Sequence, residues 1–186
     1  MAHFEKRVDR ELLYSGKVFD VYRDSVELED GSTTVRELVE HNGGVAVLAL
    51  DTENKVFMVR QFRYGAGETL LELPAGKLEK GENPRACGIR ELEEETGHVA
   101  AQFDFLAQII PTPAYDSERI DIFLARGLTP TGKGQNLDEG EFLTVERIPF
   151  KKVLEMCMDG RIIDAKTVAG VLKYHMLHEY VQRHHD

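Results

Sequence analysis

Four glutamates, Glu91, Glu93, Glu94 and Glu95, fall within five consecutive positions of a segment that the sequence predicts to be helical. Like charges at these spacings weaken a helix by roughly 0.2–0.5 kcal/mol per pair. At about 100° per residue, Glu91, Glu94 and Glu95 lie on one stripe, whereas Glu93 faces another side. The stripe does not stabilise the helix, so its residue types point to another role.

An acidic stripe has two explanations. A solvated surface is the commoner one, but such a surface usually interleaves lysines for i,i+4 pairing. Here Arg90 is the one basic residue between Cys87 and Gly97. Clustered carboxylates instead suit hard divalent cations, which take oxygen ligands. We therefore expect the stripe to bind Mg²⁺, with Mn²⁺ as the alternative.

A helix over residues 84–96 would position these carboxylates. Asn83 is a typical helix N-cap, and Pro84 suits the first helical position, where a missing N–H costs nothing. Gly97 is a left-handed helix stop. Gly88 predicts close packing on the neighbouring face, because glycine inside a helix costs roughly 1 kcal/mol relative to alanine.

The other elements predict the scaffold. Alternation over residues 18–40, around the turn Asp30-Gly31, predicts a small antiparallel β meander. Strands followed by one helix, more strands and then helices predict an α+β fold or an α/β/α sandwich. The expected strands are residues 45–50, 55–63, 70–76, 103–110, 119–125 and 141–148, and the further helices are residues 149–158 and 164–183.

Length and composition are those of one well-packed domain with a small extension, since the chain has 186 residues and is 42% hydrophobic. The Gly-rich break at residues 42–44 predicts a boundary between an N-terminal β subdomain, residues 1–42, and a main domain, residues 43–186. The net charge of −10 opposes binding to nucleic acid or to an anionic membrane, so we expect neither partner.

The two cysteines, Cys87 and Cys157, lie far apart and lack metal-ligand spacing. They are typical of free thiols in a reducing compartment. The N-terminus lacks an apolar stretch of signal-peptide length, and no run approaches the roughly 20 apolar residues that span a bilayer. We therefore expect a soluble cytoplasmic protein.

The spacing of eight residues around the acidic stripe resembles the Nudix box, a motif made specific by its many fixed positions. His98 departs from the family pattern, which has an aliphatic residue there. The resemblance implies a Nudix α/β/α sandwich with a mixed sheet, preceded by the small antiparallel meander. The eight residues are Gly76, Glu82, Arg90, Glu91, Leu92, Glu94, Glu95 and Gly97.

Outside the box the resemblance is to bacterial ADP-ribose pyrophosphatases. It implies Mg²⁺-dependent hydrolysis of the pyrophosphate bond of ADP-ribose to AMP and ribose 5-phosphate. The alternatives are another nucleoside diphosphate sugar, such as GDP-mannose or ADP-glucose, and a Nudix-fold ligand sensor without turnover. The matching segments include VRELVEH, VRQFR, LELPAGKLEKGE, IIPTPAYDSE, LDEGEFLTV and, at residues 164–167, DAKT.

The resemblance also implies a set of metal ligands. Glu82 would not bind the metal ion itself but would hold the metal ligands in place. Arg90 has two roles open to it: an ion-pair partner that orients the carboxylates, which we favour, or a phosphate contact. The implied ligands are Glu91, Glu94, Glu95 and the backbone carbonyl of Ala75.

Water must attack the pyrophosphate, so a general base is needed from outside the helix. In the family this base lies on a mobile acidic loop, here GKGQNLDEGEF, whose glycines are candidate hinges. Glu139 aligns best with the base and Glu141 with an additional metal ligand, although these two roles could be exchanged. Glu95 and Glu139 are therefore the expected catalytic residues.

Substrate contacts and a partner chain are implied in the same way. Arg36 and Arg63 match arginines that hold phosphates or the terminal ribose, a task that suits the planar guanidinium. Ala114 stands where relatives often have glycine. The N-terminal meander pairs with a second subunit in relatives, so we expect a homodimer. The other implied substrate contacts are Glu37, Lys77, Thr112, Pro113, Ala114 and Glu118.

Overall fold

The computed structural model describes residues 3–137 and 139–184. Internal contacts divide the chain into two units, and the loop 110–119 groups with the N-terminal strands, although the sequence predicted only residues 1–42 for that subdomain. One unit comprises Met1–Gly43 and Ile110–Arg119, and the other comprises Gly44–Ile109 and Ile120–Asp186.

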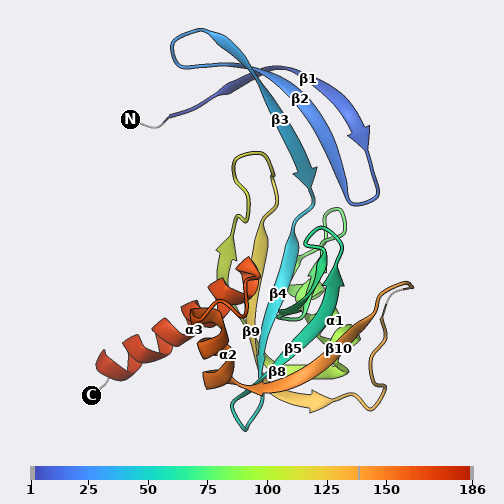
Figure 1. The fold of residues 1–186 in the computed structure, drawn as a ribbon, viewed down its shortest axis with the longest axis vertical. Coiled ribbons are helices and arrows are strands. Elements are labelled where there is room, and N and C mark those ends of the chain that lie inside the picture. The colour runs from blue at the N-terminus through green and yellow to red at the C-terminus, as the bar shows by residue number, and fades with distance from the viewer. Residues whose placement is uncertain (1–2, 138, 185–186) are drawn as a thin grey trace. The chain divides into compact units, whose positions relative to one another are not determined.

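The N-terminal unit is a three-stranded antiparallel sheet in the order β1-β2-β3 (Figure 1). The predicted turn is present, because Asp30 Oδ1 accepts the backbone N–H and the hydroxyl of Ser32, and Gly31 has a φ of 82°. The meander is thus confirmed, but its first strand was not predicted. The strands are β1 (Lys6–Ser15), β2 (Phe19–Glu27) and β3 (Thr33–His41).

The loop 110–119 binds to β3 within this unit. Val39 donates its N–H to the carbonyl of Tyr115 at 2.7 Å, and Ser117 donates its N–H to the carbonyl of Val39 at 3.0 Å. Both backbone groups of Val39 are therefore satisfied by a segment that lies far away in the sequence.

The second unit contains a seven-stranded mixed sheet in the order β10-β5-β4-β9-β8, with β6 beside β5 and β7 beside β4. The β4–β9 pair is parallel and the other pairs are antiparallel. The strands are β4 (Gly44–Leu50), β5 (Lys55–Arg63), β6 (Glu68–Glu72), β7 (Ala75–Lys77), β8 (His98–Ile109), β9 (Ile120–Pro130) and β10 (Leu143–Pro149).

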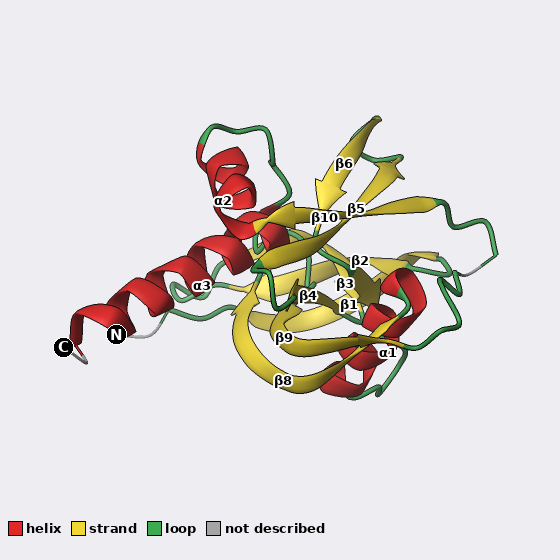
Figure 2. Ribbon diagram, turned by 90° about the horizontal axis from the view of Figure 1, so that it is seen from below, coloured by secondary structure: helices red, strands yellow, loops and turns green. Residues whose placement is uncertain are grey.

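Helices cover both faces of this sheet (Figure 2). Successive residues of a strand point to opposite faces. Along β4, Ala46 and Leu48 join the core shared with α2 and α3, whereas Val45 and Val47 join the core shared with α1. This confirms the predicted sandwich. The helices are α1 (Pro84–Thr96), α2 (Phe150–Met158) and α3 (Ala165–His184).

Several strands differ from their predicted limits, and two of the differences have local reasons. β9 ends at Pro130 instead of residue 125, and β10 starts at Leu143 instead of residue 141. The predicted strand over residues 70–76 is divided at Pro74 into β6 and β7, because proline cannot donate to a sheet ladder. The carbonyl of Pro74 still accepts the N–H of Val47 at 2.8 Å. β8 starts at His98, directly after the helix stop, instead of at residue 103.

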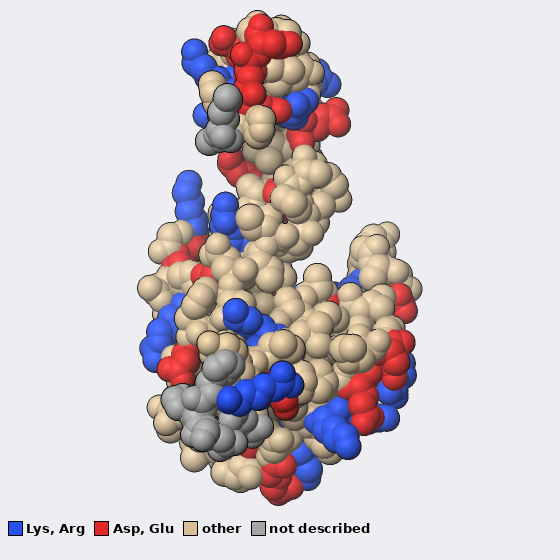
Figure 3. Space-filling view, turned by 90° about the vertical axis from the view of Figure 1, so that its left-hand side faces the viewer, with Lys and Arg blue, Asp and Glu red and all other residues tan. Residues whose placement is uncertain are grey.

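None of the described helices is both long and apolar enough to cross a membrane. Among the described residues on the face drawn in Figure 3, Lys and Arg side chains are interspersed with Asp and Glu and do not merge into one basic surface. This distribution agrees with the net charge of −10.

Candidate active site

Local capping fixes the limits of α1. Asn83 Oδ1 accepts the N–H groups of Arg85 at 3.0 Å and Ala86 at 3.2 Å. At the other end Gly97 has a φ of 68° and donates its N–H to the carbonyl of Glu93 at 2.8 Å. The helix therefore begins and ends at the predicted residues, which places the glutamate stripe in its second half.

Close packing holds α1 and its exit against the sheet. A Cβ at Gly88 would lie 2.9 Å from Cζ of Phe103, so the predicted close approach is confirmed. His98 lies beside the ring of Phe57 with 4.6 Å between centroids, and its Nδ1 is 2.7 Å from the carbonyl of Thr96. The aromatic contact therefore packs the position where the family pattern has an aliphatic residue.

Glu95 is almost fully buried, with 2% of its surface exposed. Its Oε2 accepts the N–H of Ala75 at 3.0 Å. Burial raises the pKa of Glu95 to about 8, with the charges of Glu91 and Glu141 acting in the same direction and the Ala75 N–H and Arg63 opposing it. Ala75 is therefore bonded directly to Glu95, and the charges of Glu91 and Glu141 act on the same carboxylate.

Glu91 lies directly against Gly76. A Cβ at Gly76 would stand 1.9 Å from Cδ of Glu91, so the carboxylate occupies space that only glycine leaves open. Burial raises the pKa of Glu91, and the charges of Glu94 and Glu141 also raise it, against the effect of Arg90. Glu91 can therefore occupy this position only because residue 76 is glycine.

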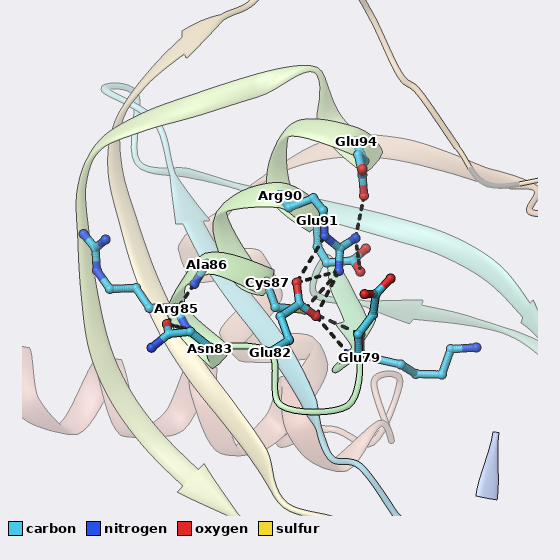
Figure 4. A network of polar contacts seen from close by, with 10 residues as sticks. Glu79, Glu82, Asn83, Arg85, Ala86, Cys87, Arg90, Glu91 and Glu94 are labelled. Atoms are coloured by element: carbon cyan, nitrogen blue, oxygen red, sulfur yellow. Dashed lines mark hydrogen bonds and ion pairs between the residues drawn. The ribbon is translucent and has the colours of Figure 1, made fainter. Parts of the chain in front are cut away.

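Arg90 lies among three carboxylates (Figure 4). Its Nη1 donates to Glu91 Oε1 and to Glu94 Oε2, both at 2.8 Å, and its Nη2 donates to Glu82 Oε1 at 3.3 Å. Glu82 Oε2 in turn accepts the N–H of Glu79 at 3.0 Å. These are the contacts of an ion-pair partner that orients the carboxylates.

The acidic loop brings one of its two glutamates to this group. Glu141 Oε1 accepts the Nε2–H of Gln61 at 3.0 Å, and its charge acts on Glu91 and Glu95. Glu139 is exposed, and within residues 3–137 and 139–184 no hydrogen bond joins it to the carboxylates. Its role as the base therefore stays a prediction.

The same loop caps the C-terminal end of α1, where the last carbonyls of a helix lack intrahelical partners. Gln135 Nε2 donates to the carbonyl of Glu95, and the N–H of Asn136 donates to the carbonyl of Glu94, both at 2.8 Å. A cleft of about 430 Å³ lies here, lined by Arg90, Glu93, Glu94, Lys133, Gly134, Gln135 and Asn136.

These bonds limit where the loop can hinge. Thr131 donates its N–H to the carbonyl of Gly97 at 2.9 Å, so the segment is attached at Thr131 as well as at Asn136. Gly132 and Gly134 lie between the two attachments, whereas Gly140 lies beyond them. The predicted hinge role therefore fits Gly140 best.

Two predicted substrate residues belong to the same unit as the carboxylates. Arg63 donates from Nε and Nη2 to the two carboxylate oxygens of Glu72, at 2.8 and 2.9 Å. Lys77 is exposed on β7. The charge of Arg63 opposes the rise in the pKa of Glu95, and the substrate roles of Arg63 and Lys77 stay predictions.

The remaining predicted substrate residues lie in the other unit, so their part in this site stays a prediction. Arg36 is exposed and pairs with Glu5, with 2.6 Å between Nη2 and Oε1. The carbonyl of Thr112 accepts the N–H of Asp116 at 3.0 Å, which makes the loop a tight turn. These residues are Arg36, Glu37, Thr112, Pro113, Ala114 and Glu118.

Residues 40–170 match the model of the NUDIX domain. The chain belongs to the NUDIX family. It is 41% identical over 178 residues to the ADP-ribose pyrophosphatase of Bacillus subtilis (strain 168), with 96% of each chain covered. It is also 41% identical over 167 residues to the methanol dehydrogenase activator of Bacillus methanolicus, with 90% of each chain covered.

A solved structure shows the same fold. The crystal structure of an ADP compounds hydrolase matches with a TM-score of 0.79 and 23% identity, over 96% of this chain and 94% of that one. The predicted family and fold class are thereby confirmed, and the chain is a Nudix hydrolase.

The donor set of the Nudix box suits a hard divalent cation. Among the described residues, no three His, Cys, Asp or Glu side chains are gathered closely enough to hold a metal ion as they stand. Arg90 takes the place between Glu91 and Glu94. Repulsion and burial nevertheless raise the pKa of both Glu91 and Glu95, and a cation at their oxygens would relieve this. The residues therefore fit Mg²⁺ or Mn²⁺ when the carboxylates bound to Arg90 also bind the metal ion.

Several residues that support this Nudix site were missed from the sequence. Glu72 is 1% exposed and Lys166 bonds to it, yet both lay in segments quoted only for their resemblance. A glutamate inside the apolar run LLEL was the available signal, because a buried carboxylate requires partners. The missed residues are Gln61, Glu72, Gln135, Asn136 and Lys166.

Proposed function

We propose that this protein hydrolyses the pyrophosphate bond of ADP-ribose, with Mg²⁺ as its cofactor. The observation that carries the proposal is Glu95, which is 2% exposed and bonded to the N–H of Ala75, and whose pKa is raised by burial and by the charges of Glu91 and Glu141, so that its negative charge is only partly compensated. A ligand sensor without turnover would not need buried carboxylates that repel one another. Every glutamate of the Nudix box is also present in this chain.

In this proposal the chain supplies binding and proton transfer. Mg²⁺, when bound, neutralises the diphosphate and lowers the pKa of the attacking water. Glu139 accepts the proton of that water, and Arg63 contacts the diphosphate oxygens. Water adds to one phosphorus and the other phosphate leaves, which gives AMP and ribose 5-phosphate. The residues that would hold the cation are Glu91, Glu94, Glu95, Glu141 and, through its carbonyl, Ala75.

The substrate can be tested separately from the chemistry. Phosphate release after phosphatase coupling would be measured for ADP-ribose, ADP-glucose and GDP-mannose with Mg²⁺. We expect the highest kcat/KM for ADP-ribose. A preference for GDP-mannose would overturn the substrate and leave the mechanism standing, whereas no release from any of the three would remove the hydrolase proposal.

One relative's name favours a second candidate function. The Bacillus methanolicus protein is named a methanol dehydrogenase activator, and it is as similar in identity as the pyrophosphatase. The second candidate is therefore activation of a methanol dehydrogenase. Dehydrogenase turnover with and without this protein, and with Glu95→Gln, tests it, and an unchanged turnover would remove this candidate.

We further propose a cytoplasmic homodimer that associates through the N-terminal sheet. Exposed apolar side chains on so small a sheet support an interface, since large exposed apolar surfaces mark association sites. The two free thiols, Cys87 and Cys157, support a reducing compartment. The exposed apolar residues of the sheet are Val8, Leu12, Leu13, Tyr14, Phe19 and Val35.

A further inference from the structure

Charged side chains connect the start of α3 to the end of β5. Arg63 is bound to both oxygens of Glu72, at 2.8 and 2.9 Å. Lys166 Nζ bonds to Glu72 Oε2 and, at 2.8 Å, to Asp164 Oδ1. The side chains of Glu72, Lys166 and Asp164 are 1%, 11% and 14% exposed, against 39% for Arg63. The network is thus buried everywhere except at Arg63.

The DAKT segment, residues 164–167, builds the buried end of this network. Asp164 Oδ2 accepts the N–H of Thr167 at 3.0 Å and its hydroxyl at 2.5 Å. Thr167 Oγ1 accepts the N–H of Leu73, the residue after Glu72, at 2.9 Å. The segment therefore fixes both the backbone beside Glu72 and, through Lys166, its carboxylate.

Arg63 interacts electrostatically with both this network and Glu95 of α1. Burial lowers the pKa of Arg63, but the hydrogen bond and charge of Glu72, with the charges of Glu95 and Asp164, raise it overall. Arg63 in turn opposes the rise in the pKa of Glu95. One guanidinium thus acts on both the network and the proposed metal ligands.

Lys166 holds the carboxylate to which Arg63 is bound. A carboxylate bound by one bidentate arginine forms a pair whose charges largely cancel. Lys166 shares Glu72 Oε2 with Nη2 of Arg63 and is itself bonded to Asp164, so two cations face two carboxylates and Lys166 acts on Arg63 by holding the carboxylate of Glu72 in place. Stability alone would not require this, because apolar residues of similar volume often replace a buried ion pair without loss.

We propose that Lys166, held by Asp164, is a positioning residue that, by fixing Glu72, sets the place of the Arg63 guanidinium for binding the substrate diphosphate. The inference rests on the proposed function, in which Arg63 contacts the diphosphate oxygens.

The test compares Lys166→Met with wild type, Lys166→Arg and the control Lys173→Met, an exposed position on the same helix. We expect Lys166→Met to raise the KM for ADP-ribose about tenfold with kcat within about twofold, because it removes binding common to ground and transition states. Lys166→Arg should restore most of the affinity. In an Arg63→Ala background, Lys166→Met should have no further effect on KM, because Lys166 is proposed to act on the substrate only through Arg63.

Two results would overturn the positioning role: an unchanged KM in Lys166→Met, or a KM effect that persists in the Arg63→Ala background. An absence of turnover in wild type would refute the proposed function instead. The positioning role would then be decided by the crystal structure of Lys166→Met. A displaced Arg63 guanidinium supports the role, and one that keeps its wild-type position on Glu72 contradicts it.

Discussion

Glu93 and Glu95 lie two positions apart on α1 but in different surroundings. Glu95 is 2% exposed and bonded to Ala75, whereas Glu93 faces Lys133 at 3.8 Å. We predict that Glu95→Gln lowers kcat at least about 100-fold, because charge stabilisation in a buried site is lost, and that Glu93→Gln stays within about threefold. Steady-state hydrolysis at saturating Mg²⁺ measures both. Equal losses would contradict the division of the glutamates into a stripe and an outlier.

The raised pKa of Glu95 predicts a pH dependence for the metal-free protein. Because folding raises this pKa from 4.5 to about 8, the folded state binds more protons between these values. The stability from Glu95 is therefore fully present below pH 4.5 and is lost as pH rises through about 8. Thermal unfolding without metal should show a steeper loss of Tm over this window in wild type than in Glu95→Gln, and Mg²⁺ should reduce the difference. Parallel pH profiles would exclude Glu95 as the source.

Gly76 gives a test of metal binding that leaves the ligands intact. Gly76→Ala would place a Cβ 1.9 Å from Cδ of Glu91, so the carboxylate must move. We expect Mg²⁺ affinity, measured by calorimetry, to fall about tenfold, as for loss of a supporting residue. The control is Gly65→Ala, where the added Cβ meets nothing within 4 Å. Wild-type affinity in Gly76→Ala would show that Glu91 is not held there for metal.

At the scale of elements, the C-terminal end of α1 packs against the start of the acidic loop. Gly97 and Gly132 both have positive φ, of 68° and 77°, but only a Cβ at Gly97 meets a neighbour, the carbonyl oxygen of Gly134 at 2.9 Å. Both alanine variants should therefore lose roughly 1 kcal/mol from backbone strain. Gly97→Ala should lose about 2 kcal/mol more, from overpacking. Urea unfolding measures the difference, and equal losses would show that the contact is unimportant.

An element could be predicted from the sequence when the residues that determine it are close together in the sequence. The limits of α1 followed from its own caps, Asn83 and Gly97, because capping is local. The attachment of the loop 110–119 to Val39 could not be predicted, since its partners are distant in sequence. The buried network around Glu72 was missed for the same reason, because nothing near it in sequence identifies Lys166 as its partner.

At the scale of the whole molecule, the N-terminal sheet should carry a dimer interface. Leu12 is 53% exposed there, and Val181 on α3 is a control with 50% exposure. We predict a light-scattering mass of about twice 21.1 kDa for wild type and for Val181→Asp. Leu12→Asp should shift the mass towards the monomer, because burying an unpaired charge is costly. A monomeric wild type would contradict the proposed interface.

The central claim is that a metal-dependent carboxylate site hydrolyses ADP-ribose. The most direct measurement is phosphate release from ADP-ribose, coupled to a phosphatase, for wild type and Glu95→Gln with Mg²⁺ and with EDTA. The predicted result is turnover by wild type that requires Mg²⁺ and that falls to about 1% or less in Glu95→Gln. Equal rates for the two proteins, unchanged by EDTA, would contradict it.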